Sequence, residues 1–66
     1  MDWIAEKDRI AARLDACTTN DDLRAVWMAE RGMVARMKVE PTDPLLRVLG
    51  VQLENLKDYR KPLVAA

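Results

Sequence analysis

The stretch "AVWMAERGMVARM", residues 25–37, decides the fold, because at about 100° per residue it forms a helix that is apolar on two sides. One side is the expected core face, and it carries Leu23, Val26, Trp27, Val34 and Met37, with Met33 beside them. The opposite side carries Ala25, Met28, Ala29, Gly32, Ala35 and Val39. A surface helix normally has one apolar stripe and a charged back. This pattern therefore predicts neighbours on both sides of the helix.

The second apolar side is the predicted dimer or partner interface. Its small residues would let another helix approach closely, and a charge at Gly32 or Ala35 is expected to dissociate the dimer. The predicted interface residues are Met28, Gly32, Ala35 and Val39, joined by Val51 from the following segment. The alternative is an ordinary surface, since single exposed apolar residues are normal.

Glu30 interrupts the core face of the same helix. A buried carboxylate needs a cationic partner, and we favour an ion pair with Lys7 or Arg60, within the chain or between subunits. The carboxylate could instead reach solvent past the rim of the core, or mark a partner hot spot near Trp27. That candidate hot spot comprises Glu30, Arg31, Met33 and Arg36.

Capping residues divide the chain into three predicted helices, at about residues 2–17, 20–38 and 44–61. Thr19 and Asp22 resemble a capping box at the start of the second helix. Asp43 followed by Pro44 is a typical helix start.

Each flanking helix shows one apolar stripe. Glu6 and Arg9 are spaced to form an ion pair on the polar side of the first helix. The stripe of the first helix is Trp3, Ile10, Leu14 and Cys17, and that of the third is Leu45, Leu49, Gln52, Leu53 and Leu56. Val48, Val51 and Tyr59 lie outside the third stripe, and Gly50 would be tolerated more easily if another backbone came close.

Short connections predict antiparallel neighbours, so we expect residues 1–66 to form a single all-α domain of three helices. The alternative is a helical hairpin paired or swapped with a second chain. A chain of 66 residues buries only about 60% of its unfolded surface. Extra stabilisation from helix packing or self-association is therefore expected, and we predict a homodimer.

The composition excludes several function classes. The chain has no His and no Ser, and its single cysteine, Cys17, lies on a core stripe. We therefore predict no catalytic residue, metal, cofactor or small-molecule substrate. No apolar run approaches the length of a membrane span, and residues 1–9 lack the form of a signal peptide. A cytoplasmic protein is expected.

Nucleic-acid binding is the alternative function. Eleven basic residues balance eleven acidic ones, so the bulk charge does not favour DNA or RNA. A local patch on the third helix could still bind nucleic acid through Arg47, Lys57, Arg60 and Lys61. The competing interpretation is a solvated face whose basic end matches the helix dipole.

The stretch "LDACTTNDDLRAVW", residues 14–27, resembles helical tail segments of phage single-strand annealing proteins over about a fifth of the chain. The parts of those proteins that bind DNA have no counterpart here. The chain as a whole resembles in type the small helical proteins of phages and prophages that inhibit host proteins, including anti-CRISPR and anti-quorum-sensing proteins. That resemblance implies a non-enzymatic regulator or inhibitor that self-associates and binds a host protein.

Overall fold

The computed structural model describes residues 1–60, which form three helices and no strand. The helices are α1 (Trp3–Ala16), α2 (Asn20–Met37) and α3 (Pro44–Arg60). Each described end agrees with the predicted end to within one residue, while the predicted last residue of α3, Lys61, lies outside the described residues. The chain is a small all-α three-helix domain, as predicted.

Side-chain caps explain where the helices begin. The Thr19 hydroxyl accepts a hydrogen bond from the backbone N–H of Asp22 at 3.1 Å. Before α3, the Asp43 carboxylate accepts from the N–H of Leu45 at 2.9 Å, and Asp2 caps α1 in the same way. Because these caps satisfy N–H groups that have no partner inside the helix, local sequence is enough to set the starts.

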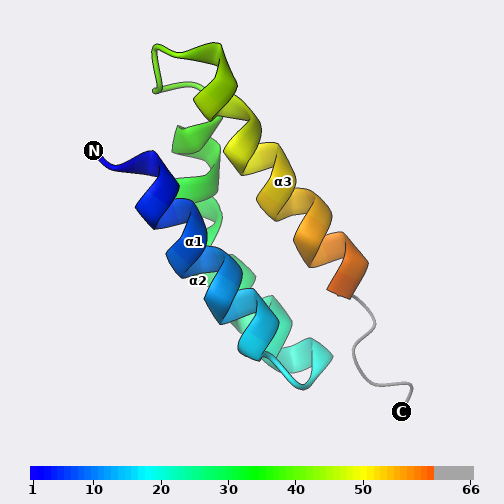
Figure 1. Cartoon of the computed structure of the whole chain (residues 1–66). Helices are drawn as coiled ribbons and strands as arrows, with labels where there is room; N and C mark the ends of the chain where they lie inside the picture. The colour runs from blue at the N-terminus through cyan, green and yellow to red at the C-terminus, as the bar shows by residue number, and fades with distance from the viewer. Residues whose placement is uncertain (61–66) are drawn as a thin grey trace.

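The three helices run down, up and down in the view of Figure 1, so that α2 is antiparallel to both α1 and α3. Their inner faces form one core. Its buried apolar members are Ile10, Leu14, Cys17, Leu23, Val34, Met37 and Leu53. Trp3, Ala11, Val26, Trp27, Met33 and Leu56 pack around them and are partly buried.

The predicted stripe of α3 is wrong at two positions. Leu45 is 77% exposed and Gln52 is also exposed, so neither belongs to the core. The inward side is formed instead by Leu46, Leu49, Leu53 and Leu56, with Gly50 among them. The 3-4-3 spacing of these four leucines keeps them on one side of a helix. Leu45 lies at one edge of this side, about 100° from Leu46, and its side chain is exposed.

Gly50 lies where α3 comes close to the backbone of α2. A Cβ atom added there would be 2.9 Å from the carbonyl oxygen of Val34 and 2.6 Å from Cγ of Lys38. Another backbone does come close, as the sequence suggested, and it is that of the chain's own α2. At Gly32, by contrast, an added Cβ would meet no atom of the described residues within 4 Å.

The last residue of α3 ties that helix to the end of α1. One terminal nitrogen (Nη2) of Arg60 donates hydrogen bonds to the backbone carbonyls of Asp15, at 3.0 Å, and Cys17, at 2.6 Å. These carbonyls lie at a helix C-terminus, where no intrahelical donor remains and a cation is favourable. The contact holds the parallel ends of α1 and α3 together.

Candidate interaction surfaces

The first candidate surface is the outer side of α2, which we call the α2 outer face. Its members are Ala25, Met28, Ala29, Gly32, Ala35 and Val39, and all six are exposed. Met28 is 54% exposed and Val39 is 71% exposed. The prediction that this apolar side points away from the chain's own core is confirmed. Val51, the fifth predicted interface residue, is also exposed but belongs to α3.

Along one edge of the α2 outer face, the charged side chain of Arg36 is paired with neighbouring groups of its own chain. The Arg36 guanidinium donates to both carboxylate oxygens of Glu40, at 2.7 and 3.1 Å, and lies 5.8 Å from the centre of the Trp3 ring. The hydrogen bonds from Arg36 lower the pKa of Glu40, and those to Glu40 raise the pKa of Arg36. This edge is therefore close to neutral.

The other edge is cationic. It carries Arg24, Arg31 and Lys38 at seven-residue intervals, which keeps all three on one flank of the helix. Lys38 Nζ is 3.0 Å from a carboxylate oxygen of Glu54 on α3. Arg24 and Arg31 are exposed. The α2 outer face thus has a positive border on one side.

Glu30 lies inside the bundle and is 6% exposed. The Arg9 guanidinium donates to both of its carboxylate oxygens, and Arg13 donates to one of them at 2.6 Å. Arg9 also pairs with Glu6 at 2.8 Å, as predicted from their spacing. The expectation of an internal ion pair for Glu30 is confirmed.

The partners predicted for Glu30 are wrong. Lys7 shares the core-facing side of α1 but makes no hydrogen bond or ion pair with Glu30 among residues 1–60, and Arg60 contacts the end of α1 instead. Arg9 and Arg13 lie four residues apart on the flank of α1 beside α2, and their long side chains reach the carboxylate while staying about half exposed. A helical wheel of α1 places both arginines on the polar side. The apolar pattern therefore gives no sign that they contact Glu30.

The pKa of Glu30 is lowered, mainly because Arg9 donates hydrogen bonds to its charged form, although burial acts in the opposite direction. The same contact raises the pKa of Arg9. Glu30 is therefore ionised at neutral pH and its oxygens are occupied by the chain's own cations. Its role in this structure is to join α2 to α1.

The candidate hot spot of four residues is not brought together. Glu30 is buried and Met33 is half-buried against the core. Arg31 and Arg36 are exposed on opposite edges of the α2 outer face. No common surface within the described residues contains all four.

The basic residues of the nucleic-acid alternative are also dispersed. Arg47 Nε donates to the Pro41 carbonyl at 2.7 Å, and Arg60 caps α1. Lys57 Nζ lies 4.7 Å from the centre of the Trp27 ring. Lys61 is outside the described residues. The three described cations thus point to different neighbours and form no shared patch.

The second candidate surface is the outer side of α3, which we call the α3 outer face. It holds six exposed, uncharged residues, namely Leu45, Val48, Val51, Gln52, Asn55 and Tyr59. Tyr59, at 86% exposed, and Leu45 are the two most exposed large apolar residues of the described chain. The sequence already placed Val48, Val51 and Tyr59 outside the core stripe. Leu45 was missed because it was assigned to that stripe.

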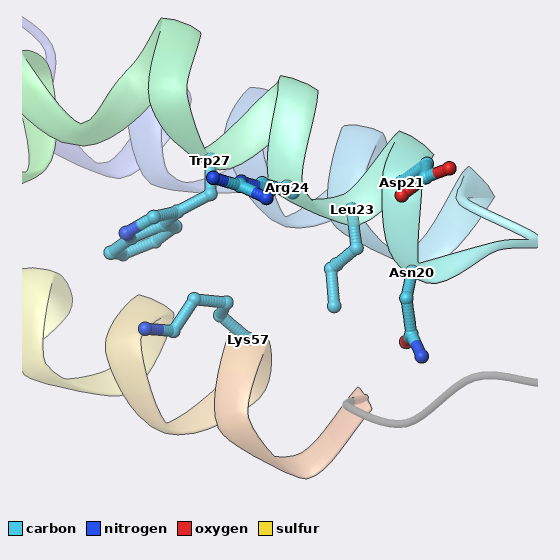
Figure 2. Close-up of a pocket in the computed structure, with 6 residues that line it drawn as sticks. All are labelled: Asn20, Asp21, Leu23, Arg24, Trp27 and Lys57. Atoms are coloured by element: carbon cyan, nitrogen blue, oxygen red, sulfur yellow. The ribbon is translucent and has the colours of Figure 1, made fainter.

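A surface hollow of about 390 Å³ lies between the first half of α2 and the end of α3 (Figure 2). Leu23 and Trp27 extend from α2 toward α3, where Lys57 approaches the indole, while Asp21 points away from the gap (Figure 2). The remaining lining residues are Asn20 and Arg24. Its lining mixes acidic and basic groups around apolar ones.

Comparison with protein-family models, curated proteins and solved structures finds no match to this chain. None of the helices described within residues 1–60 is long and apolar enough to cross a membrane. Within the same residues, no group of three or more Cys, Asp or Glu is placed to hold a metal ion. The two uncharged helix faces and the hollow beside Trp27 are candidate sites within residues 1–60.

Proposed function

We propose that this protein is a non-enzymatic interaction module that self-associates, and that it binds a second protein through the α2 outer face. The observation that carries the proposal is that all six residues of this face are apolar or glycine and exposed. A contiguous exposed apolar patch on a soluble domain is typical of an interaction site. The resemblance in type to small phage regulators suggests that the second protein is a host protein whose activity the module inhibits or regulates.

Gly32 supports the choice of this face. A glycine in the middle of a helix costs about 1 kcal/mol relative to alanine. At Gly50 close packing of α3 on α2 explains the glycine, whereas the space beside Gly32 is open. A partner helix crossing at Gly32 would come close to the backbone of α2, and this approach would explain the glycine there too.

The cationic border indicates which partner fits. Arg24 and Arg31 line one edge of the α2 outer face. Complementary charges at an interface rim raise the association rate and disfavour wrong partners. The best occupant is therefore an amphipathic helix with an apolar face and acidic residues along one border.

Charge substitution on the face tests the proposal. Gly32→Glu and Ala35→Glu would each place a carboxylate within the apolar surface, and Ala12→Glu on the exposed side of α1 is the matched control. Each tagged variant is used for capture from a lysate of the cells that express the protein, and bound proteins are identified by mass spectrometry. Binding is then measured by calorimetry with the purified candidate.

We expect one protein to bind the wild type and Ala12→Glu with equal affinity and to lose at least tenfold affinity for the two face variants. Circular dichroism checks that all variants remain helical. Equal binding by all four proteins would show that the partner uses another surface and would overturn the proposal for α2. The proposal would also be overturned if no lysate protein bound the wild type and was lost with the two face variants.

A further inference from the structure

The α3 outer face has a symmetric arrangement of residues along the helix. Leu45 lies seven residues before Gln52 and Tyr59 lies seven residues after it. Seven residues are about two helical turns, so both large side chains project on the same side as Gln52. The most exposed apolar residues of the described chain therefore mark the two ends of one uncharged stripe.

The charges beside the stripe follow the same symmetry. Arg47 lies five residues before Gln52 and Asp58 six residues after it, and both are exposed on the same flank of α3. Within the chain, Arg47 donates to the Pro41 carbonyl and an oxygen of Asp58 lies 3.2 Å from Nζ of Lys57. Arg47 and Asp58 differ in sign and are nearly equidistant from the centre. When the direction of the helix is reversed about Gln52, the position of Arg47 therefore nearly coincides with that of Asp58, which has the opposite charge.

We propose that the chain self-associates through the α3 outer face, as an antiparallel pair of α3 helices related by a two-fold axis near Gln52. In such a pair Leu45 of each chain packs on Tyr59 of the other, and Arg47 of each chain faces Asp58 of the other. A two-fold interface uses the same patch on both chains, so each favourable contact occurs twice. The inference rests on the self-association in the proposed function and assigns a surface to it.

A parallel α3 pair does not produce these contacts. A two-fold axis along the helices would place each residue at the height of its own copy, so Arg47 would not meet Asp58. The flank that would then face Arg47 carries Leu49 and Leu56, which are partly buried in their own chain. Charge complementarity therefore favours the antiparallel arrangement.

The α2 outer face fits a second copy less well. An antiparallel two-fold pair of α2 helices would bring the cationic edge of one chain against the same edge of the other, because equivalent flanks meet in that arrangement. Arg24, Arg31 and Lys38 would then face like charges, which disfavour association. Self-association through α3 leaves the α2 outer face open for an acidic partner helix.

A mixing experiment tests the proposed pairing. Arg47→Glu alone places two carboxylates opposite each other at each facing pair, and Asp58→Arg alone places two guanidinium groups there, so each homodimer is weakened. In a heterodimer of the two variants, one facing pair joins the two substituted positions and the other joins the two original residues, and both pairs again have opposite signs. Sedimentation equilibrium measures the dimer dissociation constant of each protein and of the equimolar mixture, and a mass tag on one variant identifies the heterodimer.

We expect each variant alone to dimerise about tenfold more weakly than the wild type, and the mixture to recover most of the loss as heterodimer. Arg47→Glu also removes the hydrogen bond to the Pro41 carbonyl, and circular dichroism reports whether that variant folds. If it does not, Leu45→Glu mixed with Tyr59→Lys applies the same logic to the other facing pair. A mixture no tighter than its components would overturn the antiparallel pairing.

The two faces are separated by comparing Leu45→Glu with Gly32→Glu. We expect Leu45→Glu to be monomeric and Gly32→Glu to remain dimeric, which replaces the expectation from the sequence that a charge at Gly32 dissociates the dimer. The reverse result would overturn this inference while leaving self-association intact through α2. A wild-type chain that stays monomeric at hundreds of micromolar would remove both the inference and the self-associating part of the proposed function, but not partner binding by the α2 outer face.

Discussion

Glu30 shows how a charged residue can occupy a position that the apolar pattern of α2 reserves for the core. Its carboxylate is removed from water, yet Arg9 and Arg13 donate to it while their own side chains stay about half exposed. Only one of the three ionic groups is therefore substantially desolvated. Losing the acceptor charge at Glu30 should cost more than losing an exposed carboxylate, because the two guanidinium groups would lose an ionised acceptor in a partly dry site.

Replacing the Glu30 carboxylate with an amide should destabilise the fold. We expect Glu30→Gln to lower the free energy of unfolding by about 1–2 kcal/mol, since the side chain keeps its shape but loses its charge-assisted hydrogen bonds. Glu40→Gln is the matched control, because Glu40 also accepts two hydrogen bonds from an arginine but is exposed. Urea unfolding followed by circular dichroism should give a clearly smaller loss for the control, because solvent screens an exposed ion pair. Equal effects would show that burial of Glu30 adds nothing.

The same carboxylate should make stability depend on pH. Arg9 lowers the pKa of Glu30 in the folded chain below its ordinary value of 4.5. A group with a lowered folded-state pKa contributes stability above the unfolded value and loses it as pH falls through the folded value. The urea midpoint of the wild type should therefore decrease as the pH falls below about 4.5. Glu30→Gln should show a shallower decrease, and parallel profiles for the two proteins would contradict the assignment.

At the scale of the helix, the sequence predicts ends well and neighbours less well. Thr19 and Asp43 cap their helices through bonds to residues two or three positions away, so the information is local. The partners of Glu30 could not be read in this way, because they depend on how α1 is rotated and offset against α2. Leu45 illustrates the same limit. The apolar stripe of α3 could include either Leu45 or Leu46, and only the packing of the helices shows that Leu46 is the inward residue.

The sequence predicts the α2 outer face in full and the α3 outer face only in part. The α2 outer face follows from helical periodicity alone and was predicted completely. Of the α3 outer face, Val48, Val51 and Tyr59 were recognisable as residues outside the core stripe, but its symmetry about Gln52 became visible only once Leu45 and Gln52 were known to be exposed.

The two glycines should respond to alanine in opposite directions. At Gly32 the added methyl group meets open space, so Gly32→Ala should raise the free energy of unfolding by about 0.5–1 kcal/mol through helix propensity. At Gly50 it would overlap the Val34 carbonyl, and Gly50→Ala should lower the free energy of unfolding by about 1–3 kcal/mol. Urea unfolding measures the change in the free energy of unfolding for each variant. A low, fixed protein concentration keeps self-association from contributing to either value. A stabilising Gly50→Ala would show that α3 can move away from α2 at little cost.

The whole molecule has a small core for its three helices. Seven buried apolar side chains make up that core among the described residues, while Leu45, Tyr59 and the α2 outer face remain in contact with water. A domain of this size is marginally stable by itself. Association through an exposed face would bury further apolar area and add stability that depends on concentration.

Thermal unfolding should therefore depend on protein concentration. If the folded chain dimerises and the unfolded chain does not, each tenfold rise in concentration above the dimer dissociation constant stabilises the folded chain by about 0.7 kcal/mol. For a domain of this size, that corresponds to an increase in Tm of about 3–6 °C. Leu45→Glu should show a Tm independent of concentration, because one side chain at each end of the proposed α3 pair is lost, whereas Ala12→Glu should follow the wild type. Melting curves across two decades of concentration measure the slope for each protein, and the same positive slope for Leu45→Glu as for the wild type would place the dimer interface outside the α3 outer face.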